Sequence, residues 1–168
     1  MPNIYGEGVP DASGMRVAVV AALFNDQFTK RLCNGAVTTA REHGVEDQAI
    51  DVYWVPGVFE IPLMAGELAA SGAYDAIACV GAVVRGETPH FDFVAGEAAR
   101  GIMEVGRESG VPLGFGIITA DTLAQAEARS GGNVGNKGSE AMFAALQVAA
   151  LLREVSVLQD VTEEEDEA

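Results

Sequence analysis

The sequence has few basic residues, few histidines and few cysteines, and each shortage excludes a class of function. Its 10 lysines and arginines stand against 25 aspartates and glutamates, which gives a formal net charge of −15. Nucleic acid binding requires a basic face, so we expect no nucleic acid partner. The 2 cysteines and 2 histidines lack the spacing of a metal site, and no Gly-x-Gly-x-x-Gly motif follows the first apolar run. We therefore expect neither a metal nor a cofactor.

Long apolar runs are also missing. No continuous run reaches the roughly 18–20 residues that a membrane span needs. The N-terminal residues MPNIYGE have neither the basic start nor the apolar stretch of a secretory signal. Cys33 and Cys79 lie within apolar segments, which is typical of reduced core thiols. These features predict a cytoplasmic protein that has no membrane partner.

Length and composition predict one domain with an arm and a tail. The 168 residues are 49% hydrophobic, which suits a single compact domain with a buried core. We expect an N-terminal arm at residues 1–14, one domain at residues 15–156 and a tail at residues 157–168. Because 6 of the last 10 residues are acidic, we expect this tail to be solvated and disordered.

Apolar segments of two kinds alternate along the chain. Short continuous runs rich in valine predict buried strands, and longer segments with helical spacing predict helices. We expect strands at residues 15–22, 50–55, 76–84 and 113–119, helices at residues 26–43, 58–70, 89–108, 122–129 and 137–155, and a loop at residues 131–135. Such alternation indicates a parallel sheet covered by helices on both faces.

Two of the expected helices, at residues 58–70 and 137–155, have apolar residues on most of their sides. A helix of this kind needs cover on more than one side. A four-stranded sheet supplies one cover, so we expect a neighbouring subunit to supply the second. The alternative is that these alanine-rich helices tolerate exposure.

Three segments that follow expected strands contain the residues of a candidate binding site, because ligands of open parallel sheets bind at the carboxyl ends of the strands. These segments are residues 23–26, 56–62 and 85–92. In the third, Thr88 is expected to cap the next helix and Pro89 to occupy its first turn, while Gly86 lets the backbone approach a ligand. Free amide groups and the helix dipole there favour an anion such as phosphate.

The side chains of these segments suggest more than one kind of contact. His90, beside the anion site, is a candidate proton carrier at neutral pH, although it could instead pack or cap. Phe24 and Phe59 are suited to stacking on a flat heterocycle, with core packing as the alternative. Asn25 and Glu60 can bind hydroxyl groups, and Glu60 alternatively favours a helix N-terminus.

Two basic residues flank a glycine-rich loop near the C-terminal helix. Arg129 precedes this loop and Lys137 follows it, but the spacing is not that of a Walker A motif. Taken alone, both residues would be surface charges. His43 precedes Gly44 and is expected to cap a helix C-terminus.

Five segments, in this order and spacing, resemble the lumazine synthase family. They are Phe24-Asn25, PGVFEIP at 56–62, GAVVRGETPHFDFV at 81–94, FGI at 115–117 and GNKG at 135–138, and the third is the most specific. The resemblance implies a flavodoxin-like three-layer α/β/α fold with a central four-stranded parallel sheet. It also implies an enzyme of riboflavin biosynthesis that uses no cofactor. Such enzymes condense 5-amino-6-(D-ribitylamino)uracil with 3,4-dihydroxy-2-butanone 4-phosphate to 6,7-dimethyl-8-ribityllumazine and release phosphate.

The resemblance also implies which residues act in the site. His90 would transfer protons and Arg129 would bind the phosphate. Residues expected to bind the substrates are Phe24, Asn25, Val58, Phe59, Glu60, Val83, Val84, Gly86, Glu87, Thr88, Phe115 and Lys137. Phe24 would stack on the pyrimidine. Phe59 and Glu60 would hold the ribityl arm, with Asn25 nearby. The phosphate loop would consist of Gly86, Glu87 and Thr88.

The resemblance further implies a homo-oligomer built from pentamers. Phe115, Arg129 and Lys137 would come from the adjacent subunit. The short glycine-rich loop between Arg129 and Lys137 is similar to that of relatives that form icosahedral shells, which predicts a 60-mer. Asn133 departs from relatives that carry lysine there, which would weaken the attraction for phosphate.

Two other functions remain open at this point. A riboflavin synthase of the archaeal kind shares this fold and uses lumazine as its substrate. A shell protein that binds a flavin or lumazine without turnover is the second alternative, although it would have no need of His90.

Overall fold

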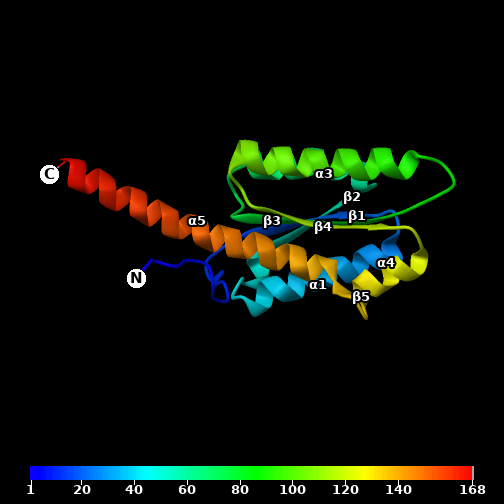
Figure 1. Cartoon of the computed structure of the whole chain (residues 1–168), viewed down its shortest axis with the longest axis horizontal. Helices are drawn as coiled ribbons and strands as arrows, with labels where there is room; N and C mark the ends of the chain where they lie inside the picture. Colours follow the sequence, from blue (N-terminus) through cyan, green and yellow to red (C-terminus); the bar gives the residue numbers. More distant parts are fainter. Residues whose placement is uncertain (168) are drawn as a thin grey trace.

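The computed structural model describes residues 1–167 and consists of a parallel sheet, five α-helices and a small hairpin (Figure 1). The main strands are β1 (Val17–Ala22), β2 (Ile50–Val55), β3 (Ala76–Val84) and β4 (Leu113–Ala120). The α-helices are α1 (Asp26–Glu42), α2 (Ile61–Ala70), α3 (His90–Ser109), α4 (Leu123–Arg129) and α5 (Lys137–Glu167). Two short 3-10 helices are η1 (Asp47–Ala49) and η2 (Val58–Glu60), and the hairpin pairs β5 (Ser130–Gly132) with β6 (Gly135–Asn136).

The four main strands form one sheet in the order β2-β1-β3-β4, and every neighbouring pair is parallel. All six residues of β1 are buried, because helices cover the sheet on both faces. Figure 1 shows α3 on one side of the sheet and α1, α4 and α5 on the other. The predicted flavodoxin-like three-layer α/β/α fold is therefore confirmed.

The core consists of two clusters separated by the sheet. Alternate residues of a strand point to opposite faces, so Val17 and Val19 pack on the α1 and α5 side while Ala18 and Val20 pack on the α2 and α3 side. Met142 and Leu146 of α5 are completely buried in the first cluster. The free thiols of Cys33 and Cys79 are buried, one in each cluster, and burial raises their pKa to about 11 and about 12.

Two glycines allow α5 to approach its neighbours closely. A Cβ atom built on Gly138 of α5 would overlap the backbone of Leu32 in α1, lying 2.6 Å from its carbonyl carbon. A Cβ atom on Gly114 of β4 would likewise lie 2.5 Å from the carbonyl carbon of Ala141. The missing side chains let α5 lie directly against α1 and the edge of the sheet.

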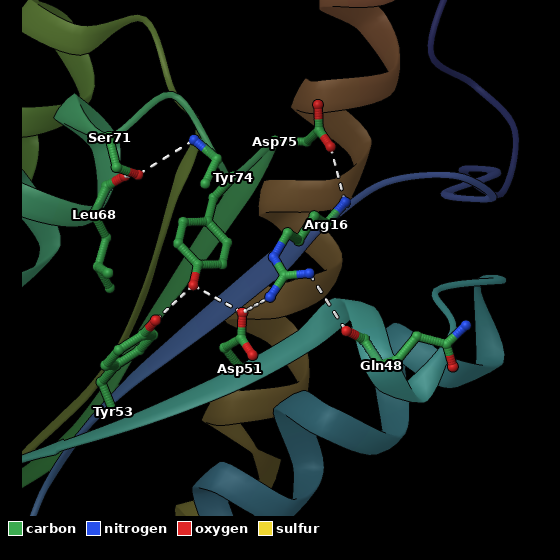
Figure 2. A network of polar contacts seen from close by, with 9 residues as sticks. Arg16, Gln48, Asp51, Tyr53, Leu68, Ser71, Tyr74 and Asp75 are labelled. Carbon is green, nitrogen blue, oxygen red and sulfur yellow. Dashed lines mark hydrogen bonds and ion pairs between the residues drawn. The ribbon is translucent and has the colours of Figure 1, made fainter.

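A polar network ties together the amino ends of three strands (Figure 2). The guanidinium of Arg16 pairs with Asp51 at 2.5 Å, and the hydroxyl of Tyr74 donates a hydrogen bond to the same carboxylate at 2.8 Å. The hydroxyls of Tyr74 and Tyr53 are 2.6 Å apart, and the backbone amide of Arg16 donates to the Asp75 carboxylate. Burial and these hydrogen bonds raise the pKa of Tyr74 above its ordinary value. The network fixes the end of the sheet that lies opposite the candidate site.

Most expected elements occur with bounds shifted by at most two residues, but one expected loop was wrong and the last helix extends beyond residue 155. Residues 131–135 belong to the β5–β6 hairpin instead of an irregular loop. The tail expected to be disordered continues α5 as far as Glu167, because no glycine or proline follows Gly138 to end the helix. The last residue of the expected tail, Ala168, lies outside the described residues.

Of the described helices, α5 alone is long and apolar enough to cross a membrane by length and composition. A helix that packs in a protein core passes the same test. The first turns of α5 pack in the core, where Met142 and Leu146 are completely buried, whereas residues 152–163 are exposed.

Candidate functional site

A cavity of about 870 Å³ opens at the carboxyl ends of β1, β2 and β3. Its wall is formed by the loops after these strands and by the first two turns of α3. Ten of the residues expected in the site line this cavity: Phe24, Asn25, Val58, Phe59, Glu60, Val83, Val84, Gly86, Thr88 and His90. The topology therefore brings together residues from the three segments that the sequence singled out.

The loop after β1 presents Phe24 to the cavity. The amides of Leu23 and Phe24 donate hydrogen bonds to the carbonyls of Val55 and Pro56, at 2.8 and 3.1 Å. Asn25 adopts the left-handed conformation with φ 63°, and its Nδ2 donates to the carbonyl of Ala82 at 2.9 Å. Asn25 thus connects the β1 loop to β3, and its amide nitrogen is engaged within the fold.

This geometry leaves Phe24 72% exposed, although it comes soon after a completely buried strand. The exposure excludes the core-packing alternative for Phe24 in the single chain. An exposed ring on the wall of a cavity is suited to stacking on a planar ligand.

The loop after β2 presents Phe59 and Glu60. Val58 is buried and packs over Gly81 of β3, where a Cβ atom would lie 2.6 Å from a methyl carbon of Val58. This contact holds η2 against the sheet, while Phe59 is 61% exposed. Glu60 directly precedes α2 and makes no side-chain capping hydrogen bond, so its carboxylate is accessible to a ligand.

The loop after β3 leads into α3, which begins at His90. Pro89 is the N-cap residue and makes no side-chain capping bond, so the expected cap by Thr88 was wrong. A proline fixes the backbone for the helix start, and Thr88 then lies one position too early to cap it. No backbone hydrogen bond of residues 1–167 uses the amide groups of Gly86, Glu87 or Thr88. These groups can therefore donate to an anion.

Arg85 at the end of β3 forms the main charged contacts near this loop. Its Nε donates to the Asp121 carboxylate at 2.8 Å, and its Nη1 lies 3.5 Å from a carboxylate oxygen of Asp92. The guanidinium also lies over the ring of Phe91, 4.4 Å from the centroid. Hydrogen bonding to Asp121 is the main cause that raises the pKa of Arg85 above its ordinary value.

Four expected residues do not line this cavity in the single chain: Glu87, Phe115, Arg129 and Lys137. Phe115 lines a second hollow, of about 570 Å³, that lies beside β4 between α3 and α5. Arg129 donates to the carbonyl of Gln125 at 3.1 Å, and Lys137 pairs with Glu140 at 2.6 Å. Both contacts are within the residue's own helix, as expected for surface charges.

The sequence analysis missed the part of α3 that continues the cavity wall. Phe93, Val94 and Glu97 line the cavity together with His90. Their spacing of three, four and seven residues from His90 places them on one face of a helix, and this pattern could have identified them. In the part of the chain that the structure describes, no three His, Cys, Asp or Glu residues are arranged to hold a metal ion.

The comparison with known families agrees with this arrangement. The family model described as 6,7-dimethyl-8-ribityllumazine synthase matches residues 14–153. The matched region contains the whole sheet, all three loops of the cavity and the first half of α5.

Proposed function

Since this chain belongs to the 6,7-dimethyl-8-ribityllumazine synthase family, we propose how its cavity performs the reaction of that family. The protein is a transferase of riboflavin biosynthesis. It condenses 5-amino-6-(D-ribitylamino)uracil with 3,4-dihydroxy-2-butanone 4-phosphate to 6,7-dimethyl-8-ribityllumazine, and phosphate is released. The roles of individual residues, the assembly and the cytoplasmic location are our proposals.

The pyrimidine substrate binds at the loops after β1 and β2. Its ring stacks on the exposed face of Phe24. Phe59 and Glu60 hold the ribityl arm, with the Glu60 carboxylate accepting hydrogen bonds from its hydroxyls. Val58, Val83 and Val84 complete this part of the site, and Asn25 shapes it through its bond to Ala82.

The phosphorylated substrate binds at the loop after β3. The free amides of Gly86, Glu87 and Thr88 and the N-terminus of α3 donate to the phosphate. Arg129 of an adjacent subunit supplies a positive charge that stabilises the departing phosphate.

His90 lies between the two substrates and carries protons. The amine of the uracil attacks the ketone, and imine formation, loss of phosphate and ring closure each require proton transfer. Holding both substrates in one cavity removes much of the entropy cost of their encounter. The observation that supports this function most strongly is that Phe24 and His90, from different loops, line one cavity.

The site is completed between subunits of a pentamer, twelve of which form an icosahedral shell. Leu63 of α2 and Met103 of α3 are 73% and 65% exposed, and Phe115 of β4 is 46% exposed. Apolar side chains exposed on several elements indicate a surface that a neighbour covers. In this assembly, Phe115, Arg129 and Lys137 reach the cavity of the adjacent subunit.

Product analysis with the purified protein tests the function. Incubation with both substrates is expected to release phosphate and form lumazine, which absorbance and chromatography detect. Conversion of added lumazine to riboflavin would instead support the archaeal kind of riboflavin synthase. Binding of lumazine without either reaction would indicate the shell protein without turnover. Particle mass from light scattering tests the assembly.

A further inference from the structure

Arg85 lies behind the anion-binding loop and does not line the cavity. Arg85 directly follows β3, and its backbone amide donates to the carbonyl of Ala120 at the end of β4 at 2.8 Å. Its guanidinium contacts Phe91 and Asp92, which follow the loop, and Asp121, which follows β4. Arg85 therefore connects both ends of the loop to a third segment.

The Asp121 end of this connection is itself held in place. The amide of Asp121 donates to Oε1 of Gln125 at 2.7 Å, and Gln125 and Thr122 form a capping box at the start of α4. A carboxylate on a fixed turn can hold the guanidinium in one position. By contrast, α3 begins without a capping side chain, and residues 86–88 donate no backbone hydrogen bond within the described chain. The contacts of Arg85 with Phe91 and Asp92 hold the residues that directly follow this segment.

The charges argue against Arg85 as a direct ligand of the phosphate. Its guanidinium is already paired with two carboxylates, and Arg85 is not among the residues that line the cavity, although its guanidinium lies over Phe91, which is. Asp92 and Asp121 would each repel an anion bound nearby. If either carboxylate favours anion binding, it therefore does so by holding Arg85 in position.

We propose that Arg85, anchored by Asp121, is a positioning residue that sets the conformation of residues 86–89, and thereby the phosphate-binding amides and His90. The inference rests on the proposed function of this loop. It makes Asp121, a carboxylate outside the cavity, a residue that strengthens the binding of an anion.

The sign of the effect of Asp121→Asn tests the proposal. Electrostatics alone predicts tighter phosphate binding when a negative charge is removed. Positioning predicts weaker binding, because the anchor of Arg85 is weakened. We expect Asp121→Asn to raise the dissociation constant of inorganic phosphate and the KM for the butanone phosphate by about fivefold, and Arg85→Met to raise both by about tenfold. The KM for the uracil substrate is expected to stay near the wild-type value.

Arg41→Met is the matched control, since Arg41 also pairs with a carboxylate, Asp47, but lies in α1 away from the cavity. Exposed ion pairs contribute little to stability, so all variants are expected to unfold at similar temperatures. The double variant Arg85→Met with Asp121→Asn is expected to bind phosphate as Arg85→Met does, because both changes break one connection.

Calorimetric titration of the full-length protein with inorganic phosphate measures binding without requiring turnover. Tighter or unchanged phosphate binding by Asp121→Asn, or additive effects in the double variant, would overturn the positioning role. Failure of the wild-type protein to form lumazine would count against the proposed function, whereas an active wild type with an unaffected Asp121→Asn would count against this inference alone.

Discussion

Replacement of Gly138 by alanine should separate α5 from α1 and destabilise the protein. The added methyl group would overlap the carbonyl oxygen of Leu32 and lie 2.9 Å from its Cα atom. Because the obstacle is backbone and no flexible side chain can rotate away, α5 must move outward and loosen the packing of Met142 and Leu146. Overpacking of this kind costs about 1–3 kcal/mol, and a backbone obstacle favours the upper end.

Gly96→Ala is the matched control for this change. Gly96 lies within α3, and a Cβ atom there would meet no atom within 4 Å. Alanine is favoured over glycine in a helix interior by about 1 kcal/mol, so this variant should be more stable than the wild type. The two variants should therefore differ by about 4 kcal/mol in the free energy of unfolding. Urea unfolding at one fixed protein concentration measures this difference, and equal stability of the two variants would refute the reasoning.

Four further predictions concern the site and the core. His90→Ala should lower kcat by roughly a hundredfold without abolishing turnover, because the cavity still holds the two substrates close together. Steady-state kinetics measure this effect, and an unchanged rate would show that His90 does not transfer protons in the reaction. Phe24→Ala should raise the KM for the uracil substrate by roughly tenfold through loss of stacking, with a smaller change in the KM of the butanone phosphate. Arg129→Ala should raise the KM for the butanone phosphate by about tenfold, and an effect on the uracil substrate alone would contradict the phosphate role. Cys33 and Cys79, whose pKa values are raised to about 11 and about 12 by burial, should not react with a thiol reagent at pH 8 until the protein is unfolded in urea.

The central strands β1 and β3 could be predicted because most of their residues are buried on both faces of the sheet. The bounds of β3 coincide with the apolar run at residues 76–84, and β1 lies within the run at residues 15–22. Burial on both faces produces continuous apolar runs that have clear ends. The β5–β6 hairpin could not be predicted in this way, because strands of three and two residues rich in glycine have no detectable period.

The far end of α5 shows two local rules in conflict. The acidic composition of residues 157–168 predicted disorder, whereas glutamate is a good helix former and no residue there breaks a helix. An acidic composition means that a segment has little apolar surface to bury. A helix that is already formed in the core can nevertheless extend into such a segment, because adding residues to an existing helix does not require further burial.

The part of the cavity wall that is formed by the loops after β1, β2 and β3 could be predicted from the sequence. The carboxyl ends of parallel strands meet at one edge, so Phe24, Glu60 and His90 were expected together and do line one cavity. Phe115, Arg129 and Lys137 do not line the cavity of the single chain, and in the proposed assembly an adjacent subunit supplies them. Their contribution depends on how subunits pack, which the pattern of a single sequence does not determine.

The network of Arg16, Asp51 and Tyr74 has a consequence for the redesign of this protein. It fastens the strands at the edge farthest from the cavity, so the framework does not depend on the loops that contact ligands. Replacement of residues 59–60 or 86–89 by sequences of equal length, with the buried Val58 kept, can thus change ligand preference while the sheet keeps its register. The chain is in this respect a scaffold on which new small-molecule specificities can be selected.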